Sequence, residues 1–140
     1  MKKVEGNLTK HLTIDDYGVH QTEAVYISEN ALKHAKRVEK FIVWLNKKEP
    51  PKINAWYRSK AYNAKVGGVK NSLHLTGEAT DLGIAKFSTY TEERIAKYAK
   101  KWKKICEDDG VVGEFGTYSW GIHLGSNIKY SRSFYRFDKR

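Results

Sequence analysis

The sequence predicts an α+β fold in which helices pack against a small antiparallel sheet. Residues 28–48 and about 92–108 carry apolar side chains at three- and four-residue steps, a pattern typical of amphipathic helices. The shorter stretches 52–59, 79–84 and 111–125 instead have the apolar content and the bounding turn residues of strands. A chain of 140 residues can bury a core of its own, so we expect a single domain over residues 1–140.

Helical signals come first along the chain. Thr13 can cap a short helix that begins at Ile14, and Ser28 can cap a longer helix that runs to Lys48. The Pro50-Pro51 pair then ends this helix, because proline cannot continue the helical hydrogen-bond ladder.

Strand signals dominate the middle of the chain. A strand is expected over 52–59, with alternate residues from Ile53 to Tyr57 on one face. A short helix over 59–66 follows, and two glycines close it. The apolar-leaning run from Ala79 to Ile84 then predicts a short buried strand.

The last third combines a helix with a hairpin. Thr89 and Glu92 fit a capping box at the start of the second long helix. Residues 111–125 indicate a hairpin whose turn is centred on Gly116. The tail, residues 129–140, mixes aromatic residues with arginine, which suits either a terminal strand packed on the domain or stacking on bases or sugars.

Composition and charge narrow the functional classes. No apolar run approaches 18 residues, so we expect no membrane span, and the start lacks the apolar segment of a secretion signal. We therefore expect synthesis in the cytoplasm and release before any action outside it. The single cysteine, Cys106, cannot form an internal disulfide and is expected to be a buried thiol. The net charge of +10 favours a polyanionic partner such as nucleic acid, a membrane surface or the bacterial cell wall.

The most informative stretch is 72–81, which has the pattern S-x-H-x-x-G-x-A-x-D. Zinc accepts imidazole nitrogen and carboxylate oxygen, and hydrolytic zinc sites typically have three protein ligands. His74 and Asp81 are therefore either part of a metal site that needs a third ligand, or an ordinary hydrogen-bonded histidine in a turn and an aspartate that caps a strand. His11 and His20 are expected to be isolated surface histidines.

Several motif elements occur together and in order: Tyr57-Arg58-Ser59, Tyr62-Asn63, Val66-Gly67-Gly68 and the 72–81 pattern. With them the chain resembles the zinc D-alanyl-D-alanine carboxypeptidase family, strongly over about 70 residues and loosely over most of its length. Those peptidases share their fold with the hedgehog signalling domain and include phage endolysins that cut peptidoglycan peptides. The resemblance implies a hedgehog-like α+β domain whose sheet carries a Zn²⁺ site.

The resemblance also implies roles for individual residues. It implies that His74, Asp81 and His123 bind Zn²⁺, the last from the late hairpin. Arg58 matches the arginine that holds the substrate carbonyl or carboxylate, and a guanidinium suits this role because it stays charged and donates two parallel hydrogen bonds. Ser72 is expected to orient the substrate or the first ligand.

The sequence departs from the family near its last histidine. Members often place an acid shortly before that histidine or an aspartate two residues after it, and here Trp120 and Gly125 hold these positions. Glu114 is the nearest carboxylate in the hairpin and is our candidate for the general base. Glu78 and the cluster 107–109 are alternatives, and the cluster is expected to serve the helix end.

We therefore expect a zinc metallopeptidase that cuts peptide bonds in peptidoglycan, either as a carboxypeptidase or as an endolysin-type endopeptidase. Its partners would be the peptidoglycan peptide and the anionic cell wall, reached after release such as phage lysis. We expect a monomer without specific nucleic-acid binding, because no nucleic-acid motif is present. Two alternatives stay open: a zinc-containing, hedgehog-like binding module without hydrolytic activity, and a basic nucleic-acid-binding protein.

Overall fold

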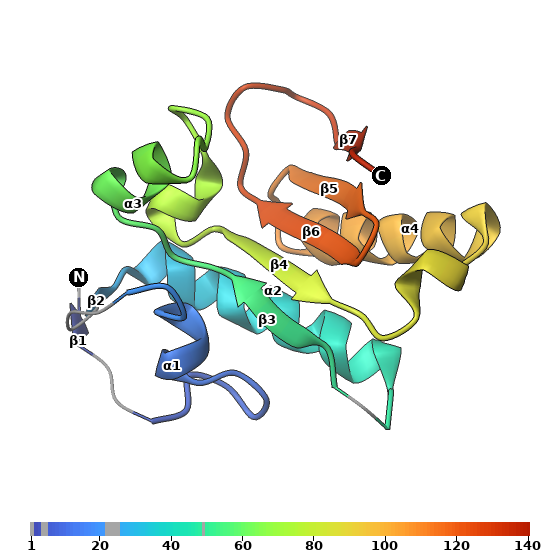
Figure 1. Cartoon of the computed structure of the whole chain (residues 1–140), viewed down its shortest axis with the longest axis horizontal. Helices are drawn as coiled ribbons and strands as arrows, with labels where there is room; N and C mark the ends of the chain where they lie inside the picture. The colour runs from blue at the N-terminus through green and yellow to red at the C-terminus, as the bar shows by residue number, and fades with distance from the viewer. Residues whose placement is uncertain (1, 4–5, 22–25, 49) are drawn as a thin grey trace.

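A five-stranded sheet and two long helices form the body of the protein (Figure 1). The computed structural model describes residues 2–3, 6–21, 26–48 and 50–140. The sheet has the order β3-β4-β6-β5-β7, with β3 (Lys52–Ala55), β4 (Ala79–Gly83), β5 (Gly113–Tyr118), β6 (Gly121–Ser126) and β7 (Tyr135–Asp138). The other elements are α1 (Ile14–Tyr17), α2 (Glu29–Leu45), α3 (Lys60–Lys65), α4 (Glu92–Asp108), the 3-10 turns η1 (Leu73–Thr76) and η2 (Phe87–Thr89), and a ribbon of β1 (Lys2–Lys3) and β2 (Tyr26–Ile27). The predicted α+β class is confirmed.

The first two helices begin where the sequence predicts. The side chains of Thr13 and Ser28 each accept a hydrogen bond from a backbone N–H in the first turn of the helix that follows. α2 ends at Leu45 rather than at Lys48, because Asn46 takes the left-handed conformation with φ 48°.

α4 begins after Thr91, whose side chain accepts a hydrogen bond from the N–H of Arg94. The capping box predicted at Thr89 is wrong, because Thr89 is the last residue of η2. The amphipathic pattern predicted for the helix is confirmed. Its buried face includes Cys106, which is 1% exposed.

β3 is shorter than the strand predicted over 52–59. The register with β4 shifts between Ile53 and Ala55, and Ala55 and Trp56 are both buried, so the expected alternation fails. The chain then leaves the sheet. Ser59 caps α3, which confirms the predicted short helix.

β5 and β6 form the predicted hairpin, but its turn lies at residues 119–120 and not at Gly116. Gly116 pairs with His123 in the middle of the strands. A Cβ at Gly116 would lie 2.1 Å from the ring of Phe137. The glycine therefore allows close packing and makes no turn.

The sheet is mixed. The predicted antiparallel pairing holds from β3 to β5, and β7 alone runs parallel to its neighbour β5. The loop 127–134 turns the chain back at the end of β6, so the last strand runs in the direction of β5. The tail thus forms a terminal strand. Phe137 packs on the domain, with its ring centroid 5.3 Å from that of His123, whereas Tyr130 and Tyr135 stay exposed.

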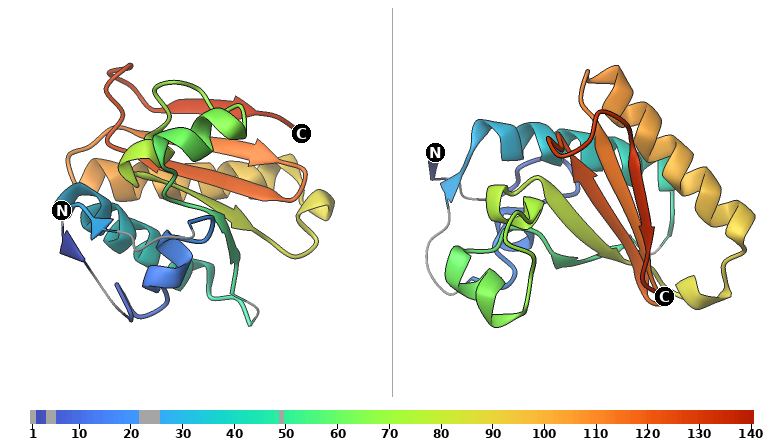
Figure 2. Two further views of the ribbon diagram at one scale, coloured as in Figure 1. Left: turned by 60° about the vertical axis from the view of Figure 1, so that its left-hand side comes forward. Right: turned by 90° about the horizontal axis from the view of Figure 1, so that it is seen from above.

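α2 and α4 lie against one face of the sheet (Figure 2). Successive strand residues point to opposite faces, so Leu82 and Ile122 enter the core while Asp81 and His123 face the other side. Among the described residues, no helix is long and apolar enough to cross a membrane.

A buried polar network ties α2 to the sheet. His34 is fully buried, and its two ring nitrogens lie 2.7 Å from Ser126 Oγ and 3.0 Å from Thr80 Oγ1. Arg37 donates to the same Ser126 hydroxyl and to Asp109. These contacts hold the strands that carry Asp81 and His123 in a fixed position relative to α2.

Candidate metal centre

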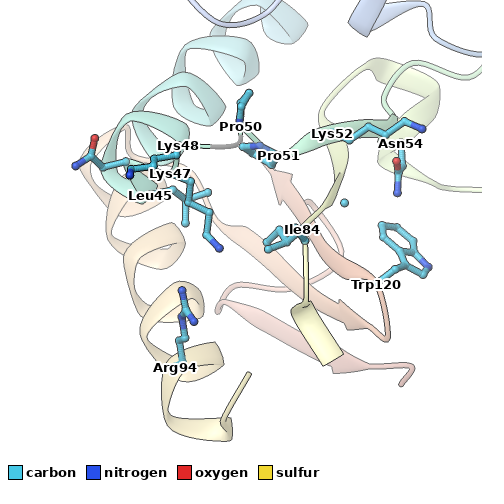
Figure 3. Close-up of a pocket in the computed structure, with 13 residues that line it drawn as sticks. Leu45, Lys47, Lys48, Pro50, Pro51, Lys52, Asn54, Ile84, Arg94 and Trp120 are labelled. Carbon is cyan, nitrogen blue, oxygen red and sulfur yellow. The ribbon is translucent and has the colours of Figure 1, made fainter. Parts of the chain in front are cut away.

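Two of the hollows in the described structure differ in chemistry and matter for the site. One of about 1070 Å³ lies between the end of α2, the start of β3 and the β5–β6 turn (Figure 3), and it holds none of the predicted site residues. Another, of about 490 Å³, is lined by Arg58, Ser72, His74, Glu114 and His123, among others. The chemistry predicted from the sequence therefore gathers at the smaller hollow, called here the site pocket.

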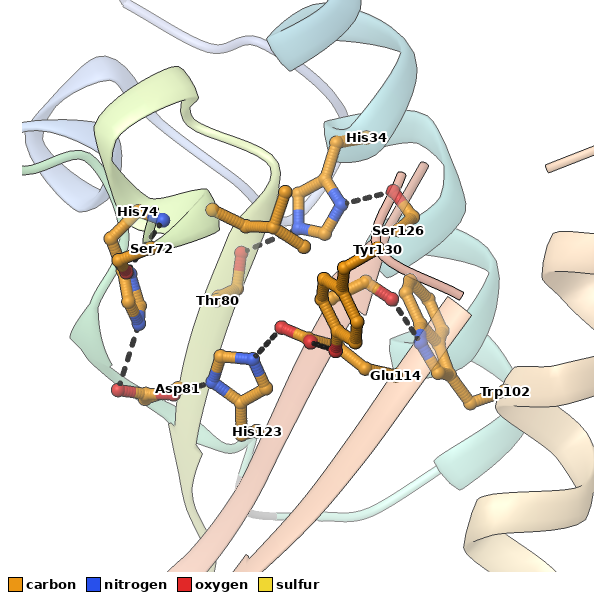
Figure 4. Close-up of polar contacts among 12 residues, drawn as sticks. His34, Ser72, His74, Thr80, Asp81, Trp102, Glu114, His123, Ser126 and Tyr130 are labelled. Atoms are coloured by element: carbon orange, nitrogen blue, oxygen red, sulfur yellow. Dashed lines mark hydrogen bonds and ion pairs between the residues drawn. The ribbon is translucent and has the colours of Figure 1, made fainter. Parts of the chain in front are cut away.

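His74, Asp81 and His123 converge from η1, β4 and β6 (Figure 4). One nitrogen or oxygen atom from each lies within 4.8 Å of those of the other two, and all three residues are buried. His74 Nε2 is 3.3 Å from Asp81 Oδ2, and His123 Nδ1 is 2.7 Å from Asp81 Oδ1. The predicted trio thus forms one cluster.

The local sequence explains this convergence. Asp81 and His123 are direct partners in the pairing of β4 with β6, so their side chains stand side by side. His74 lies on η1, where Ser72 Oγ accepts a hydrogen bond from the backbone N–H of His74 at 3.2 Å. Gly77 ends η1 with a φ of 73°, a conformation that favours glycine. The turn between the two motif residues is therefore built into the 72–81 stretch.

The donor set suits zinc. Two imidazoles and a carboxylate are common zinc ligands, with bonds of about 2.0–2.2 Å. His74 Nδ1 donates to the carbonyl oxygen of Trp56 at 2.6 Å, which leaves Nε2 with its lone pair toward Asp81. Small side-chain movements would bring the three donor atoms onto one ion.

The site attracts positive charge. Burial disfavours the imidazolium of His123, but the carboxylates of Asp81 and Glu114 outweigh this effect and raise its pKa to about 9. Burial also acts to raise the pKa of Asp81 and of Glu114, yet their contacts with His123 hold both pKa values below the usual range. Two ionised carboxylates therefore flank the histidine on either side.

Glu114 contacts the ring nitrogen of His123 that points away from Asp81. Its Oε1 lies 2.7 Å from His123 Nε2, and its other oxygen accepts a hydrogen bond from the Tyr130 hydroxyl. Glu114 pairs with Gly125 across β5 and β6, and a Cβ on Gly125 would lie 2.3 Å from Glu114 Cγ and 2.5 Å from its Oε1. The carboxylate beside His123 thus fills the space that a side chain at position 125 would need.

Arg58 reaches the site pocket from the segment after β3. Its Nη2 lies 4.0 Å from Asp81 Oδ2, and its Nη1 donates to Asn63 Oδ1 at 3.4 Å. Its buried Nε has no hydrogen-bond partner among the described residues. A buried N–H of this kind favours a partner that enters from the pocket.

The alternative residues lie elsewhere. Glu78 is buried but accepts a hydrogen bond from Asn127 at 2.8 Å. The cluster 107–109 forms ion pairs with basic residues of α2 and α4. His11 and His20 are exposed, as expected, but they are not isolated, because His11 contacts Glu39 and His20 contacts the backbone carbonyl of Asn54.

Three neighbours of the site were missed from the sequence. The carbonyl of Trp56 orients His74, the hydroxyl of Tyr130 holds Glu114, and Tyr118 lines the site pocket. A backbone carbonyl leaves no mark in the sequence. Tyr130 lies in the aromatic tail, where only the mixture of residue types drew attention.

Comparison with models of known protein families identifies a family for this chain. A family model described as peptidase M15 matches residues 8–120. The matched range includes His74, Asp81 and Glu114 and stops just before the segment with His123. No curated protein matches the chain significantly.

Proposed function

The chain belongs to the peptidase M15 family, the zinc D-alanyl-D-alanine carboxypeptidase-like family, and on that premise we propose that it is a zinc peptidase acting on peptidoglycan peptides. The observation that carries the proposal is the buried convergence of His74, Asp81 and His123 beside a pocket lined by Arg58. By resemblance, the substrate is a stem peptide with a D-residue beside the scissile bond.

His74, Asp81 and His123 would hold the zinc ion. Three protein ligands are typical of hydrolytic zinc sites, whereas structural sites usually have four. When bound, zinc supplies a Lewis acid that polarises a carbonyl and promotes the ionisation of water. The Trp56 carbonyl keeps His74 in one orientation, and Ser72 supports the same ligand through its backbone N–H.

Arg58 is proposed to bind the substrate. Its guanidinium lines the site pocket, and its buried Nε lacks a partner within the described part of the chain. A substrate carbonyl or carboxylate would satisfy this N–H and take up the charge. Asn63 accepts a hydrogen bond from Nη1 of this guanidinium. Gly68 leaves room for this contact, because a Cβ there would crowd both the Asn63 side chain and Nη1 of Arg58.

Two roles are proposed for Glu114. It is the only carboxylate among the described residues that line the site pocket, which supports the general-base role expected from the sequence. Its contact with His123 Nε2 supports a positioning role, because a carboxylate on the second nitrogen fixes a ligand histidine and raises its basicity. The roles differ in their effect on zinc affinity, since only the positioning role lowers that affinity when Glu114 is removed.

The experiment measures zinc and cleavage on the same preparation. We expect close to one zinc per chain by elemental analysis and release of peptides from purified peptidoglycan, resolved by mass spectrometry. The His74→Ala/His123→Ala variant should lose both properties. The His11→Ala/His20→Ala variant, altered at two exposed histidines, should keep both. An unchanged zinc content in the His74→Ala/His123→Ala variant would refute the proposed site.

A non-hydrolytic binding module is the second candidate. The observation that favours it is the double engagement of Glu114, whose two oxygens contact His123 and Tyr130 and so have less freedom to accept a proton from water. A zinc-loaded protein that cleaves no peptidoglycan fragment, while its His74→Ala/His123→Ala variant loses the metal, would support this candidate.

A further inference from the structure

We infer that the hollow of about 1070 Å³ is a second binding site, which takes an anionic carbohydrate polymer of the cell wall beside the peptide substrate. The inference rests on the proposed function for its choice of partner. The hollow is called here the basic groove, and the side chains that matter for the argument are Lys47, Lys48, Lys52, Arg94 and Trp120 (Figure 3).

Four cations from three segments line the basic groove. Lys47 and Lys48 follow α2, Lys52 begins β3, and Arg94 lies in the first turn of α4. Within the described part of the chain none of them forms an ion pair and no carboxylate lines the groove, while Glu49 lies outside that part. Like charges around one hollow repel each other, so a bound polyanion would stabilise the arrangement.

The cations of the groove differ from three lysines on the exposed helix faces, although other exposed lysines such as Lys36 and Lys100 also lack an ion pair among the described residues. On the exposed faces of the helices, Lys33, Lys103 and Lys104 each have an acid one helical turn away at ion-pair distance. Those lysines have the ordinary pattern of a solvated helix face. What distinguishes the cations of the groove is that all four line one hollow.

Two of the cations are held in place by one ring. Arg94 packs over Tyr90 with its guanidinium carbon 3.7 Å from the ring centroid, and Lys47 Nζ donates to the Tyr90 hydroxyl. Figure 3 shows Lys47 and Arg94 on one side of the groove and Trp120 on the other. Positioned charges lose less entropy on binding than free ones.

Trp120 links the groove to the site pocket. It lies in the β5–β6 turn, is 41% exposed and stacks on Tyr118 with ring centroids 4.8 Å apart and planes within 3°. Tyr118 in turn lines the site pocket with His123. Trp120 and His123 are three positions apart along the chain, a span of about 10 Å in a strand. A polymer in the groove would therefore lie next to a substrate at the metal centre.

The aromatic content favours a sugar polymer over nucleic acid. Proteins that bind single-stranded nucleic acid use several aromatic rings on which successive bases stack. In the basic groove Trp120 is the single aromatic ring among the described lining residues. One flat ring next to several cations fits one sugar face flanked by anionic groups, whether phosphate or carboxylate.

The test measures sedimentation of the full chain with insoluble bacterial walls. Three probes are used: walls that carry phosphate polymers, the same walls stripped of phosphodiesters with hydrofluoric acid, and a fluorescent oligonucleotide. Lys48→Glu/Lys52→Glu and Trp120→Ala should each weaken wall binding, the charge variant by at least about tenfold. The matched control is Lys36→Glu/Lys100→Glu, which makes the same charge change at exposed helix positions outside the groove and should bind within about twofold of the parent.

The outcomes separate the inference from the proposed function. Loss of binding in the groove variants alone supports the groove, and the stripped walls tell whether phosphate or carboxylate is the anion. An equal loss of wall binding in the Lys36→Glu/Lys100→Glu control, or no loss in the groove variants, overturns the inference. Tighter, groove-dependent binding to the oligonucleotide overturns the choice of partner. If the protein binds walls through the groove but cleaves no peptide, the inference about the groove holds and the peptidase proposal is refuted.

Discussion

Removal of the Glu114 carboxylate should weaken zinc binding, although Glu114 is not itself a proposed ligand. Its Oε1 lies 2.7 Å from the outer nitrogen of His123, and His123 is only 6% exposed. In Glu114→Ala no described residue replaces this contact, so the His123 ring loses both its anchor and the charge that raises its basicity. Glu114→Gln keeps an acceptor of similar shape and loses only the charge.

The structure sets the expected magnitude. Loss of a partner on the outer nitrogen of a ligand histidine typically costs 10–100-fold in metal affinity or activity. This corresponds to about 1.4–2.7 kcal/mol of binding free energy. We expect Glu114→Ala near the upper end of that range and Glu114→Gln near the lower end.

The cross-strand geometry provides a rescue. Gly125 lacks the side chain whose space Glu114 fills. In Glu114→Ala/Gly125→Asp the new carboxylate would stand close to the position that the old one leaves, on the strand face that carries His123. The double variant should recover most of the zinc affinity, whereas Gly125→Asp alone should be destabilised by the clash.

The assay is competition for zinc with a chromophoric chelator, with cleavage rates measured on the same samples. Glu78→Gln is the matched control, because Glu78 is an equally buried carboxylate that binds Asn127 away from the site pocket. Unchanged zinc affinity in Glu114→Ala would refute the positioning role. If cleavage then fell by about 10²–10⁴-fold, Glu114 would instead be the general base.

Three further predictions concern single residues. Arg58→Lys should keep zinc and fold stability but lower the cleavage rate at least about tenfold, because lysine lacks the two-donor geometry; unaltered kinetics would count against the substrate role. Burial, with nearby Arg37, holds the pKa of His34 well below the usual 6.5, so the unfolded state takes up the proton first. Stability is therefore full above about pH 6.5 and should fall by roughly 1.4 kcal/mol for each pH unit below it. Urea unfolding should show a shallower pH dependence in His34→Asn, and equal slopes would contradict this account. Burial raises the pKa of Cys106 to about 12, so iodoacetamide near neutral pH should label the unfolded but not the folded protein; rapid labelling of the native state would show an accessible thiol.

The helix starts could be predicted because their signals are local. Thr13, Ser28 and Ser59 each stand at the start of a helix and cap it within three residues. The wrong capping prediction at Thr89 also has a local cause. Thr91 can cap the same helix and does so, whereas Thr89 belongs to η2.

The site was partly predictable for the same reason. His74 and Asp81 belong to one short motif, whereas His123 is 42 residues from Asp81 and followed only from the family resemblance. The misplaced hairpin turn shows the limit of local reasoning. Gly116 resembles a turn residue in the sequence, and only the ring of Phe137 against it explains why a glycine stands in the middle of a strand.

The direct pairing of Asp81 with His123 makes strand alignment and assembly of the site a single event. A slip of one residue between β4 and β6 would turn one strand over, leaving Leu82 or Ile122 at the site and a charged group under α2. If the proposed zinc site is correct, only the aligned strands could bind the ion, and zinc would stabilise correctly paired chains by mass action. Chains that fold without metal would lack this stabilisation, and metal supply during synthesis would influence the yield of the native protein.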